Sequence, residues 1–346
     1  MAVTEHCVEI PVLGIVTRFE SNSALVLDVV EEAFGAWRTL PAALVEERTP
    51  LTVQVTVRDG EGPGGCDVAH HAPGDGCIAP RMSGGDVAHR LQGDGRLVVH
   101  ASDVMGTSDP QRGAAVAWVT PASLREGARF RHEVLEALTW ALLTRHDRQP
   151  LHAAALVHEG VGLLLCGPSG TGKSTLAYAA ARSGLRVLAE DTVFVQAWPR
   201  PRVWGIPGAL HLLPAAAAGF PELSGVTPQQ LHTGKCKVVI DTHANGAAAV
   251  ERVVEVCGVC VIGERRAMAA SQRLSGRDAV ALLDLAADPG FDAFAHTLPP
   301  LLRRLAENGA WQLHPSAAPG ESVPLLARML AELAAHAATR DDAVPA

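Results

Sequence analysis

The chain has 346 residues, of which 48% are hydrophobic and 19% are charged. These proportions exclude a protein that is disordered along its whole length, and the length is enough for one large domain or two. The 29 basic and 37 acidic residues give a formal net charge of −8. This balance argues against sequence-independent binding to nucleic acid, because such binding needs a basic face.

Several features of the sequence favour a cytoplasmic location. Residues 1–14 lack the basic stretch and following apolar stretch of a secretory signal peptide, and no apolar run reaches the length of a membrane span. The seven cysteines are an odd number at scattered positions, which favours reduced thiols. We therefore expect a cytoplasmic protein with neither nucleic acid nor a membrane as partner; a homo-oligomer is compatible with the sequence.

The first 130 residues are expected to form a β-rich domain with a long loop. Residues 51–59 alternate between apolar and polar types, as in a half-buried strand, whereas residues 61–86 are dense in Gly, Pro and Asp and predict an irregular loop. Helical spacing at 133–146 falls in a second domain, which we place at 131–335. Residues 336–346 are expected to be a frayed tail.

Two groups of residues are of types that can form a metal or redox site. The first lies in the glycine-rich loop of the first domain: Cys66, His70, His71 and Cys77. These residue types suit Zn²⁺, but the spacing matches no common zinc finger, so a metal site remains open. Cys257 and Cys260 lie in a strand-like run and would face opposite sides of a sheet, whereas a redox pair belongs at a helix N-terminus. We interpret them as core residues.

A complete nucleotide-binding motif begins at residue 167. An apolar strand at 161–166 precedes G-x-x-x-x-G-K-[ST], and a helix that ends near Gly184 follows it. Backbone N–H groups of such a loop form a nest for phosphate, and the helix N-terminus adds its positive dipole end. The predicted nucleotide-binding residues are Gly167, Pro168, Ser169, Gly170, Thr171, Gly172, Lys173, Ser174 and Thr175.

The motif assigns roles to particular side chains. Lys173 is predicted to reach the β- and γ-phosphates, and the Ser174 hydroxyl is predicted to bind Mg²⁺, so ATP and Mg²⁺ are the expected cofactors. Glu190 and Asp191 lie in the next apolar segment, residues 185–195, where we expect them at the end of a strand. Adjacent carboxylates at such a position could hold Mg²⁺ or accept a proton from a hydroxyl group. A solvated strand end is the alternative.

His152 stands at the start of the strand that leads toward this motif, and a lone histidine is more often structural. With the glycine-rich loop and the acidic pair, however, residues 151–195 resemble the HPr kinase/phosphorylase family and its HPr-kinase-like relatives. These are P-loop kinases related in fold to phosphoenolpyruvate carboxykinase. The resemblance implies an α/β P-loop domain that follows the β-rich one.

The same resemblance implies roles for three residues. His152 would lie beside the γ-phosphate, and Asp191 would accept the proton of the hydroxyl that is phosphorylated. Glu190 replaces the more usual first Asp of the pair, which leaves it as a metal ligand or as a residue that orients Lys173.

The chain departs from the true HPr enzymes downstream of the acidic pair. The glycine- and arginine-bearing loop that those enzymes use for phosphorolysis is not recognisable, nor is their acidic signature loop. Residues 203–216 and 233–241 instead resemble HPr-kinase-like proteins encoded beside peptide natural-product genes, including lasso-peptide kinases. Those relatives phosphorylate a Ser hydroxyl on a precursor peptide.

Only three of the 29 basic residues are lysines, namely Lys173, Lys235 and Lys237. Lys235 and Lys237 lie two residues apart, so on a strand their side chains share one face. Two ammonium groups on one face suit a phosphate or an acidic peptide, and we predict that they contact substrate or phosphate. A solvated face of an edge strand is the alternative.

The sequence therefore predicts an ATP- and Mg²⁺-dependent kinase. It would transfer the γ-phosphoryl group to a Ser or Thr hydroxyl on a peptide or protein, with a ribosomal peptide natural-product precursor as one candidate. The predicted catalytic residues are Asp191, His152 and Lys173, and the predicted metal ligands are Ser174, Glu190 and Asp191. Two alternatives remain: a kinase for a small-metabolite hydroxyl, and a nucleotide-binding regulatory module without transfer activity.

Overall fold

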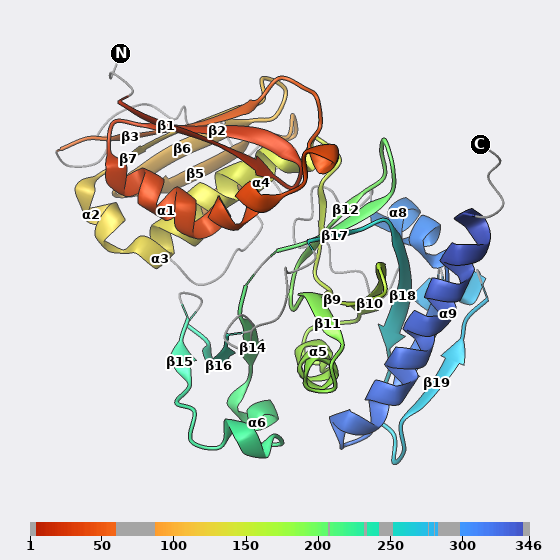
Figure 1. Ribbon diagram of the computed structural model, residues 1–346. Helices are drawn as coiled ribbons and strands as arrows, with labels where there is room; N and C mark the ends of the chain where they lie inside the picture. Colours follow the sequence, from red (N-terminus) through yellow and green to blue (C-terminus); the bar gives the residue numbers. More distant parts are fainter. Residues whose placement is uncertain are drawn as a thin grey trace. The chain divides into compact units, whose positions relative to one another are not determined.

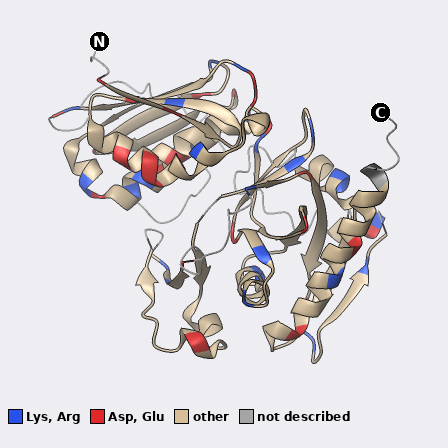
Figure 2. Ribbon diagram, viewed as in Figure 1, with Lys and Arg blue, Asp and Glu red and all other residues tan. Residues whose placement is uncertain are grey.

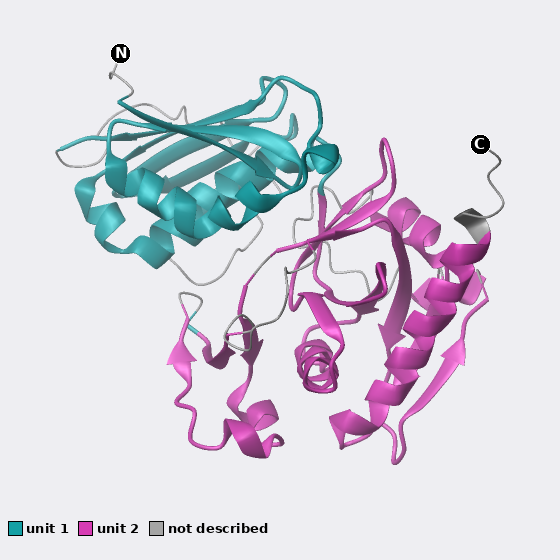
Figure 3. Cartoon of the chain, viewed as in Figure 1, with its two compact units in different colours: residues 1–148, 232–234 teal, residues 149–231, 235–346 magenta. Residues whose placement is uncertain are grey.

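The computed structural model describes residues 5–59, 87–206, 208–231, 234–241, 252–275, 277–279, 281–282 and 298–341 (Figure 1). The chain forms two compact units, of which unit 1 comprises residues 1–148 and 232–234 and unit 2 comprises residues 149–231 and 235–346 (Figure 3). Residues 131–148, expected from the sequence to begin the second domain, therefore group with unit 1. None of the described helices is long and apolar enough to span a membrane.

Unit 1 is built on one seven-stranded mixed sheet in the order β1-β2-β3-β7-β6-β5-β4. The pairs β2–β3 and β3–β7 are parallel, and the other neighbours are antiparallel. The strand expected at residues 51–59 is present as β3. The strands are β1 (His6–Val12), β2 (Ile15–Ser21), β3 (Leu51–Val57), β4 (Ala88–Leu91), β5 (Leu97–Ala101), β6 (Val104–Asp109) and β7 (Ala114–Val119).

Helices of unit 1 pack on this sheet (Figure 1). Helix α1 (Ala24–Phe34) is the crossover between the parallel strands β2 and β3 and packs on β1 and β2. Helix α4 (Ala137–Thr144) is buried along its length and packs on β6 and β7. This packing explains why the helical stretch groups with unit 1. The elements before α4 are α2 (Pro121–Arg125), α3 (Gly127–Arg129) and a π-helical turn (Phe130–Glu136).

Charged residues of both signs lie close together on these helices (Figure 2). Arg131 pairs with Glu136 at 2.8 Å and with Glu32 of α1 at 2.8 Å. These ion pairs link α1 to the π-helical turn.

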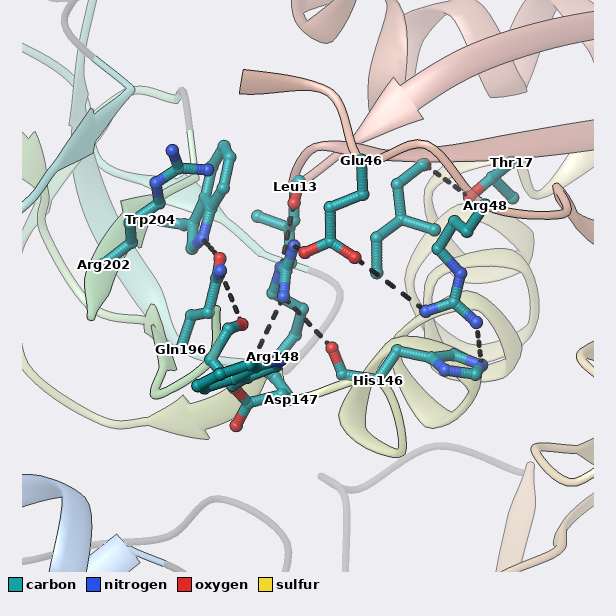
Figure 4. A network of polar contacts seen from close by, with 12 residues as sticks. Leu13, Thr17, Glu46, Arg48, His146, Asp147, Arg148, Gln196, Arg202 and Trp204 are labelled. Atoms are coloured by element: carbon teal, nitrogen blue, oxygen red, sulfur yellow. Dashed lines mark hydrogen bonds and ion pairs between the residues drawn. The ribbon is translucent and has the colours of Figure 1, made fainter. Parts of the chain in front are cut away.

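Arg148, the last residue of the first segment of unit 1, has a fully buried side chain. Its Nε donates to the Leu13 carbonyl at 2.9 Å, and its Nη1 donates to the His146 carbonyl at 3.0 Å. Its Nη2 pairs with the Glu46 carboxylate at 2.7 Å (Figure 4). A buried charge needs such partners. The guanidinium therefore ties together three separate segments of unit 1.

Unit 2 contains a six-stranded sheet in the order β11-β9-β10-β18-β20-β19. The central strands β10, β18 and β20 are parallel, and the outer strands pair antiparallel. The strands are β9 (Ala154–His158), β10 (Val161–Cys166), β11 (Arg186–Ala189), β18 (Val256–Ile262), β19 (Ala270–Arg273) and β20 (Ala310–His314).

Both faces of this sheet are covered. Leu163 and Leu165 of β10 pack with helices α5 (Lys173–Arg182) and α9 (Val323–Asp341), whereas Leu164 of the same strand packs toward α8 (Leu298–Ala306). Burial on both faces accounts for the unbroken apolar run of β10. Helix α9 continues to Asp341, past residue 336, where the frayed tail was expected to begin. The architecture is mixed α/β.

Two smaller sheets complete unit 2. A four-stranded sheet has the order β17-β13-β12-β8, and a three-stranded one has the order β14-β16-β15. Within the first, Trp204 Nε1 donates to Gln196 Oε1 at 2.8 Å (Figure 4). The elements are β8 (Gln149–Leu151), β12 (Val193–Gln196), β13 (Arg202–Gly205), β14 (Leu210–Leu212), α6 (Pro214–Ala217), β15 (Gln229–Gln230), β16 (Cys236–Ile240) and β17 (Val253–Val254).

The strand expected to end at the acidic pair is present as β11, and a second strand, β12, follows the pair in a different sheet. β11 pairs with β9 in the six-stranded sheet, whereas β12 pairs with β8 and β13 in the four-stranded sheet. The two sheets approach closely at Gly205, where a Cβ atom would overlap the carbonyl oxygen of Leu188. The chain therefore changes sheets between Ala189 and Val193, which is where the acidic pair lies.

Candidate functional site

The glycine-rich loop joins β10 to α5 in unit 2. Gly170 and Gly172 have φ angles of 87° and 99°, which glycine adopts without the strain that a side chain would cause. Gly172 is the residue before the first turn of α5, so the loop returns directly to the helix N-terminus. The strand, loop and helix expected from the sequence at 161–184 are all present in this order.

Lys173 is the first residue of α5, and its side chain folds back into the loop. The residue is only 5% exposed, and its Nζ donates to the Gly167 carbonyl at 2.6 Å and to the Pro168 carbonyl at 3.2 Å. The Thr171 hydroxyl also donates to the Pro168 carbonyl, at 2.9 Å. An ammonium group is thereby held inside the curve of the loop, while Pro168, Ser169 and Gly170 are exposed and Ser174 and Thr175 are half-buried.

Asp191 lies in the turn between β11 and β12, with a side chain that is 54% exposed. Its Oδ1 is 3.2 Å from Nε2 of His152, which lies between β8 and β9. The hydrogen bond from His152 is the main reason that the pKa of Asp191 is below its usual range; burial opposes this effect, and the positive charges of Lys237 and Lys173 add to it. The carboxylate is therefore kept ionised.

Asp191 thus interacts with three other residues singled out from the sequence: it contacts His152 at 3.2 Å, and the charges of Lys173 and Lys237 lower its pKa. These four residues come from four separate segments of unit 2. Lys237 lies on β16 and is half-buried, whereas Lys235 precedes the strand and is exposed. The electrostatic link to Asp191 therefore concerns Lys237.

Glu190 is nearly fully buried, unlike its neighbour Asp191. Its Oε2 is 3.3 Å from Nδ1 of His211 on β14, and its Oε1 is buried with no hydrogen-bond partner among the described residues. A buried carboxylate oxygen without a donor is costly, because it loses its hydration without compensation. The group is therefore suited to receive a cation or a donor that is supplied from outside the protein.

This chemistry fits Mg²⁺, which prefers oxygen ligands and is usually held by one or two carboxylates together with waters and substrate phosphates. Across the described residues, no three His, Cys, Asp or Glu side chains converge as a complete metal cage. An incomplete set of this kind is compatible with an ion that arrives with a nucleotide. Ser174, Glu190 and Asp191 are the side chains that could complete its coordination.

His211 was not singled out in the sequence. It stands between Leu210 and Leu212, which are both buried, so the strand's alternation marks it as the residue on the opposite face. The alternation shows which face of the strand carries His211, but it does not identify Glu190, which is distant in the sequence, as its partner.

The remaining cysteine and histidine groups add nothing to this site. Cys257 and Cys260 lie on β18 and pack into the cores on opposite faces of the sheet, and burial raises the pKa of both thiols. They are core residues, as expected. Cys66, His70, His71 and Cys77 lie outside the described residues.

Comparison with known proteins adds little. No protein-family model matches this chain, and no curated protein matches it either. Among solved structures, the chain is similar to the HPr(Ser) kinase/phosphatase from Coxiella burnetii, with 15% sequence identity over 57% of this chain and 96% of that chain. The TM-score is 0.32, so this similarity carries no argument about the site.

Proposed function

We propose that the protein is a kinase that transfers the γ-phosphoryl group of ATP to a hydroxyl group, with Mg²⁺ as cofactor. The observation that carries this proposal is the placement of an ionised Asp191 beside His152 and within the field of Lys173 and Lys237. Phosphoryl transfer requires cations around the phosphates and a group that positions the nucleophile and takes its proton.

The glycine-rich loop would bind the nucleotide in this proposal. Its backbone N–H groups and the N-terminus of α5 would bind the phosphates through residues 167–175. Lys173 Nζ now bonds two loop carbonyls, and it would exchange them for β- and γ-phosphate oxygens. Mg²⁺, when bound, neutralises phosphate charge. Ser174 and the acidic pair would hold the ion, with Glu190 Oε1 providing an oxygen that lacks a partner among the described residues.

Asp191 would accept the proton of the incoming hydroxyl. The hydrogen bond from His152 occupies one lone pair of Oδ1 and leaves the other oxygen for the substrate. The lowered pKa of Asp191 keeps this acceptor ionised even in mildly acidic solution. His152 would fix the orientation of the carboxylate beside the γ-phosphate.

We propose a Ser or Thr hydroxyl of a peptide or protein as the acceptor, with a ribosomal natural-product precursor as the first candidate. Two lysines support this choice, because Lys235, just before β16, is exposed to solvent, and the positive charge of Lys237 on β16 lowers the pKa of Asp191. They would bind an acidic segment or the transferred phosphate. The resemblance of residues 203–216 and 233–241 to peptide kinases points to the same class of acceptor.

The test is incorporation of labelled γ-phosphate from Mg²⁺-ATP into Ser-containing peptides, the same peptides with Ala, free amino acids and sugars. We expect labelling only of the Ser peptides, and we expect Lys173→Ala to abolish it while its circular dichroism stays that of the wild type. Turnover retained in Lys173→Ala would contradict the proposed role of the loop. Labelling of free metabolites alone would contradict the peptide acceptor, and nucleotide binding without any transfer would favour a regulatory module.

A further inference from the structure

Arg265 lies close to the glycine-rich loop although it is distant from it in sequence. Strand β18 is the parallel neighbour of β10, with Val261 opposite Cys166, so the chain leaves both strands at the same edge of the sheet. A Cβ atom built on Gly167 would lie 3.5 Å from the Ile262 carbonyl oxygen, and one built on Gly172 would lie 4.0 Å from Arg265 Nη2. The guanidinium of Arg265 therefore lies beside the N-terminus of α5.

The adjacent arginine differs in its contacts. Arg266 Nη2 is 3.1 Å from His314 Nε2, and the Arg266 backbone N–H donates to the Pro315 carbonyl. Arg265 is exposed, and among the described residues it makes no hydrogen bond or ion pair. Arg266 is thus bonded to the protein, whereas the side chain of Arg265 is available to a ligand.

The surroundings of Arg265 favour an anion. A helix N-terminus carries a partial positive charge and disfavours a nearby cation. Lys173 places a second cation in the same loop. An anion bound between two cations and a positive dipole end would be stabilised by all three. The carboxyl edge of parallel strands is also where ligands bind in open α/β sheets.

We propose that Arg265 binds the phosphate chain of the nucleotide from the β18 side of the glycine-rich loop. This inference rests on the proposed function in one respect, namely that the ligand is a nucleoside polyphosphate. The planar guanidinium can donate to two phosphate oxygens at once, which the point charge of Lys173 cannot do. Arg265 thus fixes the orientation of the phosphates, while Lys173 supplies charge from inside the loop.

The experiment measures the affinity of the full chain for adenosine, AMP, ADP and ATP by calorimetry with Mg²⁺ present. The variants are Arg265→Ala, Arg265→Lys and the matched control Arg266→Ala. We expect Arg265→Ala to weaken ATP and ADP binding by about 10- to 100-fold, the range for a lost charge-assisted hydrogen bond, and to leave adenosine unchanged. Arg265→Lys should recover part of the loss, and Arg266→Ala should bind all four ligands like the wild type.

Three results would overturn the inference. Arg265→Ala could bind ATP and ADP with wild-type affinity. It could also lose as much affinity for adenosine as for ATP, which would indicate that Arg265 contacts the nucleoside rather than the phosphates. The wild type could also bind none of the four ligands. Failure of the proposed function is distinguishable, because a phosphate-dependent defect in Arg265→Ala without phosphorylation of any hydroxyl would refute the kinase activity and leave the role of Arg265 intact.

Discussion

Replacement of His152 by Ala tests the pairing at the centre of the proposed site. The change removes the hydrogen bond to Asp191 Oδ1, which is 3.2 Å long. Charge-assisted hydrogen bonds contribute about 1.5–3 kcal/mol, but exposed ion pairs contribute about 1 kcal/mol or less. The side chains of His152 and Asp191 are 26% and 54% exposed, so we expect their interaction to contribute about 1 kcal/mol. A loss of about 1 kcal/mol corresponds to roughly a fivefold fall in transfer rate.

The His152→Ala change should also shift the pH dependence of transfer in a defined direction. Asp191 must be ionised to accept a proton, and the His152 hydrogen bond lowers its pKa. Without that bond the pKa rises, so the variant should lose activity at a higher pH than the wild type as the solution is acidified. Single-turnover transfer rates, measured from neutral to acidic pH, show this shift of the acidic limb.

A double-mutant cycle separates this coupling from an independent effect of His152. Asp191→Asn retains the shape and removes the base, so we expect a fall of about 10²- to 10⁴-fold. Adding His152→Ala to Asp191→Asn should lower the rate little further, because the partner is already lost. If His152→Ala has the same effect in both backgrounds and the acidic limb does not move, the pairing does not support the chemistry.

Three further changes have defined outcomes. Arg148→Ala leaves the Glu46 carboxylate without its buried partner and should lower the free energy of unfolding by about 3–5 kcal/mol in urea titrations, whereas exposed Arg145→Ala should change it by about 0.5 kcal/mol or less. Burial, with the nearby positive charges of Arg48 and Arg148, lowers the pKa of His146 to about 4. The unfolded chain binds that proton first, so stability should fall as the pH drops from about 6.5 toward 4, and His146→Gln should flatten this fall. Glu190→Gln should raise the Mg²⁺ concentration needed for half-maximal transfer, an effect that excess Mg²⁺ partly relieves.

The glycine-rich loop could be predicted because its signal is local. The residues that shape the turn, its preceding strand and its following helix are contiguous, so one segment carries the whole pattern. The apolar run of β10 likewise follows from burial on both faces.

Contacts between distant segments could not be predicted in this way. His211 lies on β14, which pairs with β16, and its contact with Glu190 depends on how that sheet packs. Arg265 reaches the loop because β18 and β10 are parallel neighbours. No periodicity in the sequence specifies which strand becomes the neighbour of another.

The stretch 185–195 shows what a local pattern leaves out. The strand expected to end at the acidic pair is present as β11, but its pairing with β9 shifts register between Val187 and Ala189, and the chain after the pair enters another sheet as β12. Helix α4 likewise joined unit 1 because its packing partners are β6 and β7, which no helical periodicity identifies.

The close approach at Gly205 has a consequence for how similar sequences can be screened for an intact site. Gly205 is paired with Val193 after the acidic turn, and it leaves room for the Leu188 carbonyl before that turn. One absent methyl group thus sets the spacing of the strands on either side of both carboxylates. Gly205→Ala would therefore displace the strands around the acidic turn while leaving every residue of the proposed site unchanged, and we expect it to lower the proposed transfer activity. Its defect would be invisible to a search that inspects only the chemical residues.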